Sequence, residues 1–254
     1  MNARPRPAIA ESVAPHVQTG CAACAAYEPN LCQAVSQATW ALQPGTPTQP
    51  HQSVHTVPAR RIMYREQDLH DAVPVICEGW AASIVMLSDG SRQILSFLLP
   101  GDIVSTALLF DARAHCLVEA ITEVRYRTFR RAELKGNLFK HPELLEKFSK
   151  AWIEEKARAD QLIVDLGRRT AEERIARLIL NLEDRLGRRG MVQSETMEMD
   201  FPLRQHHIAD ATGLTPVHVS KVLSEFRRSG VIKISDRSLT ILDPARFRRI
   251  ALMR

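Results

Sequence analysis

Residues 201–242 constrain the fold of this chain more than any other stretch, because they carry two closely spaced helix signals. The apolar spacing around Ile208 predicts a first helix. Gly213 is expected to end it, since glycine adopts the left-handed backbone conformation without steric cost. Thr215 is a good N-cap for a second helix, and Pro216 suits the first helical position, where no backbone N–H is needed.

Two short apolar runs follow the second helix, which Gly230 is expected to end. Residues 231–234 and 239–241 predict two strands joined at Asp236-Arg237-Ser238. A helix, a glycine turn, a second helix and a hairpin together describe a winged helix-turn-helix. In such a module the second helix enters the major groove of DNA.

The start of the second helix is expected to face base edges. Val217 can pack on a thymine methyl group, whereas the polar residues beside it can hydrogen-bond bases or phosphates. The basic residues farther along are equally well interpreted as solvated charges, and His206 and His207 as surface or capping histidines. The predicted DNA contacts are Arg204, Gln205, Thr215, Val217, His218, Ser220 and Lys221.

The overall composition agrees with a soluble protein that can bind a polyanion. The chain has 254 residues, enough for two domains with cores, and a net charge of +5. We find no apolar run that would span a membrane and no signal-peptide core, so we expect a cytoplasmic protein without a membrane partner. No Gly-rich phosphate loop, paired-carboxylate constellation or H-E-x-x-H motif is present, so we expect no enzyme.

Three of the five cysteines lie close together near the N-terminus. Cys21, Cys24 and Cys32 have the spacing C-x2-C-x7-C, which lets three thiolates converge. Thiolates are the ligands that iron–sulfur clusters and zinc select. A closed site needs a fourth ligand, for which Cys77, Cys116, a His, an Asp or an external group are candidates. The alternative is three incidental cysteines in a loop of small residues.

The middle of the chain predicts a β domain followed by long helices. Short apolar runs separated by turns over residues 59–138 indicate a sandwich or barrel-like roll. Pro142 opens a predicted amphipathic helix to residue 166. Its length suits a dimer seam, although packing on its own domain alone is the alternative. Thr170-Ala-Glu-Glu173 is a capping box for the next helix, and residues 191–200 are predicted to be a polar connection.

This order of elements resembles the Crp/Fnr family of bacterial transcription regulators. The matching motifs are Glu78-Gly79, Asp89-Gly90, Leu99-Pro100-Gly101-Asp102, Thr170-Ala-Glu-Glu-Arg174 and Gly213-Leu-Thr-Pro-Val-His-Val-Ser-Lys221. The resemblance implies an α+β fold with a cyclic-nucleotide-binding-like β-roll, a dimerisation helix and a winged helix-turn-helix. It also implies a homodimer, a near-palindromic double-stranded DNA site and contact with RNA polymerase. The expected segments are a flexible one at 1–58 with the cysteine motif at 21–32, the roll at 59–138, the dimerisation helix at 139–168 and the DNA-binding domain at 169–254.

The cysteine motif resembles the Fnr branch, whose members hold an oxygen-labile [4Fe–4S] cluster. By resemblance, an intact cluster favours the DNA-competent dimer and oxygen dismantles it. The fourth cysteine of that branch would fall near Tyr126-Arg127, where this chain has none. We therefore expect Cys116 to be the fourth ligand, with Cys77, on a strand that reads as buried, as the second choice.

Two further departures from the family matter. The cyclic-nucleotide branch holds the phosphate with an Arg-Ser-Ala run, and this chain has Ala114-His115-Cys116, so no cyclic nucleotide is expected. Val217 and Lys221 replace the usual Glu and Arg of the second helix, so the family's operator sequence does not transfer. By resemblance, the oxygen switch uses charge repulsion at the dimer seam, for which Glu154, Glu155 and Asp160 are the candidates.

Other inputs and other classes stay open at this point. The same DNA-binding regulator can sense zinc, haem or nitric oxide, thiol oxidation or a small effector, and His70 and His115 are candidate haem ligands. A different class is a metal-handling protein or enzyme that uses the roll as a binding cup. A further option is a structural DNA-binding protein with no switch.

Overall fold

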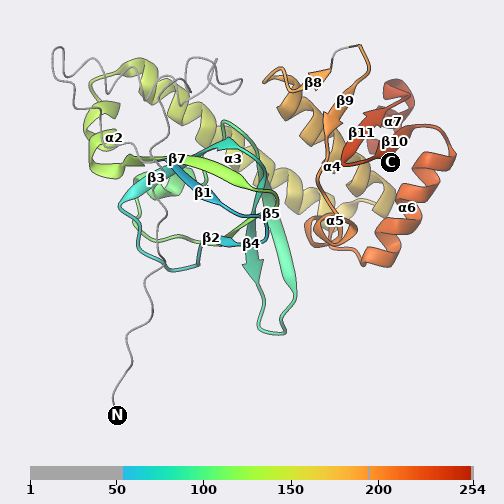
Figure 1. Ribbon diagram of the computed structural model, residues 1–254, viewed down its shortest axis with the longest axis horizontal. Helices are drawn as coiled ribbons and strands as arrows, with labels where there is room; N and C mark the ends of the chain where they lie inside the picture. The colour runs from blue at the N-terminus through green and yellow to red at the C-terminus, as the bar shows by residue number, and fades with distance from the viewer. Residues whose placement is uncertain (1–53, 194, 253–254) are drawn as a thin grey trace.

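Seven strands between residues 54 and 130 form the β-roll, which is built from two antiparallel sheets (Figure 1). The computed structural model describes residues 54–193 and 195–252. One sheet has the order β1-β7-β3 and the other β2-β6-β4-β5. The strands are β1 (Val54–Val57), β2 (Ile62–Tyr64), β3 (Ala72–Glu78), β4 (Ala81–Met86), β5 (Arg92–Leu98), β6 (Leu117–Ala120) and β7 (Val124–Arg130), with the 3-10 helix η1 (Thr106–Leu109) between β5 and β6.

The apolar runs of the sequence predict β3 to β7 correctly, but the predicted start of the roll at residue 59 is wrong. Residues 54–57, assigned to the N-terminal segment, form β1, which pairs with β7 from Val54 opposite Arg127 to Val57 opposite Val124. The short β2 was also not predicted. Both strands are brief and partly exposed, so they lack the apolar run that identifies a buried strand.

A glycine turn connects the two sheets, and a hairpin turn connects β4 to β5 within the second sheet. Gly79 has φ +81°, and a Cβ atom there would lie 2.0 Å from the carbonyl oxygen of Glu123. A side chain is therefore excluded by the close backbone approach as well as by the left-handed conformation. Asp89-Gly90 forms the turn between β4 and β5, where Asp89 Oδ1 accepts a hydrogen bond from the N–H of Ser91 at 2.9 Å.

Two helices, α2 (Arg131–Leu138) and α3 (Pro142–Arg168), connect the roll to the C-terminal domain, which begins with α4 (Ala171–Gly187). α3 begins at Pro142, as predicted, and runs to Arg168. The capping box is also confirmed: Thr170 Oγ1 accepts from the N–H of Glu173, and Glu173 Oε2 accepts from the N–H of Thr170 at 2.8 Å. None of the helices in the described ranges is long and apolar enough to cross a membrane.

The C-terminal domain, residues 171–252, combines the two predicted helices with a four-stranded sheet of order β10-β11-β9-β8. The predicted polar connection at 191–200 is wrong in part, because it contains two short strands. Met199 lies in β9, is buried in the core and pairs with Leu239 of β11. The elements are β8 (Val192–Gln193), β9 (Glu198–Asp200), α5 (Gln205–Thr212), α6 (Pro216–Arg228), β10 (Ile232–Ser235), β11 (Ser238–Ile241) and α7 (Pro244–Leu252).

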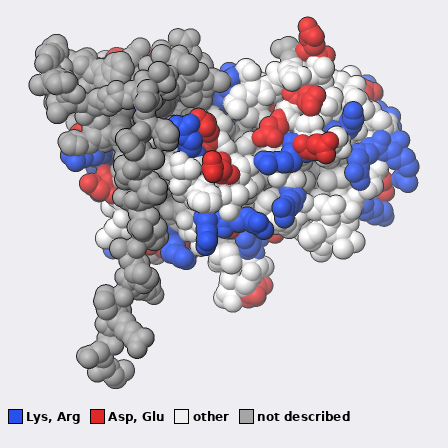
Figure 2. Space-filling view, viewed as in Figure 1, with Lys and Arg blue, Asp and Glu red and all other residues white. Residues whose placement is uncertain are grey.

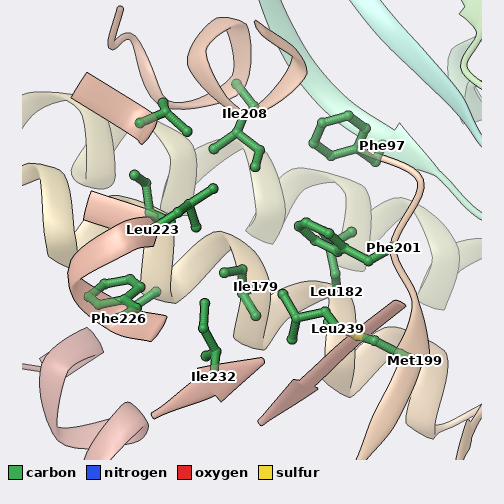
Figure 3. Close-up of a cluster of buried hydrophobic side chains, with 14 of the residues drawn as sticks. Phe97, Ile179, Leu182, Met199, Phe201, Ile208, Leu223, Phe226, Ile232 and Leu239 are labelled. Carbon is green, nitrogen blue, oxygen red and sulfur yellow. The ribbon is translucent and has the colours of Figure 1, made fainter. Parts of the chain in front are cut away.

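The roll and the C-terminal domain share one hydrophobic cluster. Phe97 of β5 lies beside the buried side chains of the C-terminal domain, including Leu182 of α4 and Phe201 (Figure 3). Ile208 of α5 belongs to the same cluster. The shared core therefore holds the helix-turn-helix against the edge of the roll that β5 forms.

Candidate nucleic-acid interface

The turn between α5 and α6 has the backbone geometry that the sequence predicts. Gly213 has φ 64° and ψ 33°, the left-handed conformation, and its N–H donates to the carbonyl oxygen of Ala209. Thr215 caps α6: its Oγ1 accepts from the N–H of His218 at 3.2 Å. Pro216 occupies the first helical position. These local signals fix the angle between the two helices.

The outer face of α6 presents the residues that the sequence assigns to base reading. Val217 is 80% exposed, and His218 and Lys221 are exposed beside it, whereas Ser220 is half-buried. The opposite face packs Val219 and its apolar neighbours into the core. An exposed valine on an otherwise polar helix face offers a methyl surface to a partner. Contact of these residues with DNA stays a prediction.

The start of α5 places the predicted phosphate contacts close to the same surface. Arg204 and Gln205 are exposed, as is Thr215 before α6. His207 is buried, and its Nδ1 accepts from the N–H of Arg204 at 3.1 Å, so it is a capping histidine. Burial lowers the pKa of His207 to about 4, and nearby His206 adds to this shift. The neutral imidazole is the form that accepts the capping hydrogen bond.

Basic side chains gather along the edge of the molecule that carries α6 and α7 (Figure 2). Arg227 and Arg228 end α6, and Arg246 of α7 donates to the carbonyl oxygen of Ser229 at 3.1 Å. Sequence reasoning missed α7, although Pro244 followed by amphipathic spacing around Phe247 is a usable helix signal. The arginines of α7 thus extend the basic edge of the molecule beside α6.

The wing is the hairpin of β10 and β11. Its turn residues Asp236 and Arg237 both have positive φ, 44° and 69°, as a two-residue hairpin turn of type I′ requires. The carbonyl oxygen of Arg237 accepts from the N–H of Phe201 at 2.6 Å, which connects the hairpin turn to the end of β9. Lys233 is exposed on β10 and adds a cation to the wing.

Polar contacts connect the helix-turn-helix to β5. Arg92 lies between two carboxylates, Glu119 of β6 at 3.0 Å and Asp210 of α5 at 3.6 Å. Gln93 Nε2 donates to the carbonyl oxygen of Ala211 at 3.4 Å. A change in the position of β5 would therefore act directly on α5.

The cysteines divide between described and undescribed parts of the chain. Cys21, Cys24 and Cys32 lie outside the described residues. Cys116 is half-buried with its Sγ 2.8 Å from Ser83 Oγ, and Cys77 is half-buried on β3, not deeply buried as its strand suggested. Within residues 54–193 and 195–252, no three His, Cys, Asp or Glu side chains are grouped to hold a metal ion.

The environment of Cys116 favours the thiol. Burial raises the pKa of Cys116, and the negative charge of Glu155 adds to the shift. Cys116 has the right donor atom for a cluster ligand. As the chain is folded here, however, it would have to give up its contact with Ser83 and lose its proton, a loss that metal coordination itself promotes.

Glu155, one of the candidate acids of the dimer seam, contacts the roll of its own chain. Its Oε2 accepts from the N–H of Thr106 at 3.1 Å and from Thr106 Oγ1 at 2.6 Å, so the side chain points into the roll. Glu154 faces arginines, Arg188 at 3.6 Å among them, and Asp160 pairs with Lys156. Each predicted repulsive acid therefore has a partner within its own chain.

The predicted counterpart of the phosphate-binding run carries no inward cation. Ala114 is buried, His115 is exposed with its Nε2 3.3 Å from Asp111 Oδ2, and Arg113 is exposed. Next to this run the Glu155 carboxylate supplies negative charge. This lining disfavours a phosphodiester.

Both the N-terminal and the C-terminal half of the chain match known protein families. Residues 54–141 match the cyclic nucleotide-binding domain model, and residues 173–250 match the Crp-like helix-turn-helix domain model. The nitrogen fixation regulation protein FixK of Bradyrhizobium diazoefficiens is 31% identical over 74% of this chain and 78% of its own length. The transcriptional activator protein FnrL of Cereibacter sphaeroides is 30% identical over 70% of this chain and 72% of its own.

The solved structure of FixK2 from Bradyrhizobium japonicum has the same fold. It superimposes with a TM-score of 0.70 at 26% identity, covering 78% of this chain and 96% of FixK2. The α+β architecture of a roll, long helices and a C-terminal helix-turn-helix, as the sequence predicts, is thus confirmed.

Proposed function

The chain belongs to the Crp/Fnr family of DNA-binding transcription regulators, and from this premise we propose that it acts as a homodimer which reads a near-palindromic operator in response to oxygen or redox state. The relatives are regulators rather than enzymes, which supports a protein without catalysis. The observation that carries the proposal is the exposed face of α6, where Val217, His218 and Lys221 stand free of the protein core. RNA polymerase is the further partner we propose.

Dimer formation is supported by the surface of α3. The buried apolar residues of this helix, Leu144 and Phe148, lie near its start and pack on the roll. Farther along, Trp152, Ile153 and Ile163 are 62%, 67% and 70% exposed. Trp152 and Ile163 lie eleven residues apart, three helical turns, so they share one stripe. Pairing of two such stripes would cover the apolar surface and set two copies of α6 about one DNA turn apart.

The dimer is tested by sedimentation of the purified full chain. Ile163→Glu places a charge in the stripe, and we expect it to shift the protein toward monomer and to weaken operator binding. Lys150→Glu is the control, because Lys150 is an exposed residue of α3 outside this stripe. A wild-type protein that sediments as a monomer at micromolar concentration would exclude the proposed dimer.

The proposed signal is carried by the cysteine motif. Cys21, Cys24 and Cys32 supply three thiolates, and Cys116 is the fourth ligand we propose for a [4Fe–4S] cluster. When bound, such a cluster supplies a group that reacts with oxygen. The contribution of the described residues is to hold Cys116 against Ser83, close enough to Glu155 of α3 to feel its charge, and Glu155 in turn bonds Thr106 of the roll.

The signal is tested by purification under anaerobic conditions. We expect a coloured protein with iron and acid-labile sulfide, and we expect loss of the colour in air. Cys→Ser variants at 21, 24 and 32 should each lose iron, and Cys116→Ser against Cys77→Ser identifies the fourth ligand. A colourless protein that takes up neither iron nor sulfide on reconstitution excludes the cluster. Bound zinc or a Soret band would assign the input to zinc or haem instead.

We also propose that the roll takes no cyclic nucleotide. The support is the lining described above, which has no inward arginine at 114–116 and has the Glu155 carboxylate nearby. Calorimetric titration with cyclic AMP and cyclic GMP should give no saturable heat. Micromolar binding of either nucleotide would contradict this.

A further inference from the structure

A cavity of about 400 Å³ lies where the roll meets the C-terminal domain. Its walls come from β5, α3, α4, the end of α5 and α7. Leu95 and Phe97 line it from the roll, Leu162 from α3 and Leu178 from α4. This size and this largely apolar lining are typical of small-molecule sites. The cavity is separate from the roll interior that holds Cys116.

The charged residues of the cavity are mostly arginines. Five arginines and two aspartates line it. The aspartates already have partners: Asp165 accepts from Arg177 at 2.7 Å, and Asp184 pairs with Arg188, which is outside the lining. Arg185 pairs with the buried Asp102, outside the lining, at 2.5 Å. Among the described residues this leaves Arg158, Arg174 and Arg248 without a carboxylate closer than 4.0 Å. The five arginines are Arg158, Arg174, Arg177, Arg185 and Arg248.

Two of these arginines have buried donors that the described residues leave unsatisfied. Nε of Arg158 and Nε of Arg185 are buried and have no hydrogen-bond partner among the described residues. Arg158 has a carboxylate, Glu154, only at 4.0 Å. Leaving a buried charged donor unpaired costs about 1–3 kcal/mol or more. Both Nε atoms are shielded from solvent, so an incoming anion would meet the rest of the Arg158 guanidinium, whose side chain is 25% exposed.

Arg174 is a further arginine of the cavity with no carboxylate partner among the described residues. Arg174 donates to two carbonyl oxygens, those of Arg169 and Thr212, rather than to a carboxylate. Burial lowers the pKa of the Arg185 guanidinium, and the neighbouring charge of Arg158 adds to the shift. The Asp102 carboxylate opposes this shift and compensates the charge of Arg185, so the attraction for an anion comes chiefly from Arg158.

We propose that this cavity binds a small organic acid, a monocarboxylate with an apolar tail. The carboxylate pairs with the accessible guanidinium of Arg158, with Arg174 and Arg248 in the same lining, and the tail packs on Phe97, Leu162 and Leu178. Planar guanidinium groups suit a carboxylate because two N–H donors can meet its two oxygens. A ligand here would touch the roll, α3 and the C-terminal domain at once, so it would act as a second input, independent of the cysteine motif.

The test uses octanoate as the probe and the full-length protein. Isothermal titration should show saturable binding of octanoate, and octanol, which has the same tail without charge, should bind at least tenfold more weakly. Arg158→Gln removes the charge and should weaken octanoate binding at least tenfold. Arg113→Gln is the matched control, because Arg113 is exposed and outside the cavity, and it should leave the affinity unchanged.

Two further measurements keep the proposal open to refutation if Arg158→Gln unfolds. Arg158→Lys keeps the charge but loses the guanidinium fork, and it should give an intermediate affinity. Leu178→Trp narrows the cavity and should abolish binding while leaving the carboxylate partners in place. No saturable octanoate binding to the folded wild type, as expected if a second copy fills the cavity, would overturn the proposal. So would an affinity that Arg158→Gln leaves unchanged.

Discussion

Asp102 of the roll lies with its Oδ2 2.5 Å from Nη2 of Arg185 on α4, and both side chains are buried. Arg189 approaches the other carboxylate oxygen at 2.5 Å. Burial alone would raise the pKa of Asp102, but the two arginines hold it below its ordinary value. The turn Leu99-Pro100-Gly101-Asp102 thus anchors the roll to the helix that carries the C-terminal domain.

Asp102→Asn should therefore be strongly destabilising. The variant leaves Arg185 buried without its counter-charge, and breaking a buried pair from one side typically costs about 3–5 kcal/mol. Urea unfolding measures the change. Glu78→Gln is the control: it removes the exposed pair with Arg125 and should change the free energy of unfolding by less than about 1 kcal/mol. Equal free energies of unfolding for the two variants would show that the buried Asp102 pair contributes no more than the exposed pair of Glu78 with Arg125.

Comparing Gly79→Ala with Gly90→Ala should separate the cost of a positive φ from the cost of a steric clash with the new Cβ atom. Both glycines have positive φ, 81° and 85°, so both substitutions pay the backbone strain of about 1 kcal/mol. Only at Gly79 does the new Cβ also meet a backbone oxygen, at 2.0 Å. Gly79→Ala should lower the melting temperature much more than Gly90→Ala. Similar losses for both variants would contradict the close approach at Gly79.

His207 should give the protein a stability that depends on pH. Its pKa is about 4 in the folded chain against an ordinary 6.5, so the unfolded state binds the proton first. The contribution is complete above pH 6.5 and is lost as the pH falls toward 4, by up to roughly 3 kcal/mol. Urea unfolding at pH 7 and pH 5 measures it. His207→Gln should flatten this dependence, whereas an unchanged slope would assign it to other groups.

Lys221→Ala should reduce discrimination between the operator and random DNA. A good side-chain contact to a base is worth about 1–3 kcal/mol, so the ratio of the two affinities should fall about tenfold or more. Lys150→Ala removes the same charge from α3 and should leave the ratio unchanged, which controls for net charge. Fluorescence anisotropy at fixed salt measures both. A uniform loss of affinity for both DNAs would make Lys221 a phosphate contact instead.

Structure was predictable from the sequence where it depends on residues close together in the chain, and not where it depends on residues far apart. Gly213, Thr215 and Pro216 set the helix-turn-helix through contacts within a few residues, so its bounds were predictable. The Asp102–Arg185 pair joins residues 83 positions apart, and nothing in the local pattern indicates it.

The same distinction explains the parts of the candidate sites that were missed. β1 and β9 are strands because of partners far along the chain, since their own sequences are short and weakly apolar. Glu155 reads as a surface acid of an amphipathic helix, and only the packing of α3 on the roll brings it to Thr106. The interdomain cavity likewise depends on how five elements meet.

Selection of bound DNA from a randomised duplex library, with protein purified without oxygen, tests most directly that a dimer reads DNA through α6. The expected product is an inverted repeat whose half-site centres lie about 10 base pairs apart. Val217→Ala should alter the preference at one equivalent position in each half-site, with the rest of the repeat retained. Failure to enrich any sequence, or enrichment of a single half-site unaffected by Val217→Ala, would contradict reading by paired α6 helices.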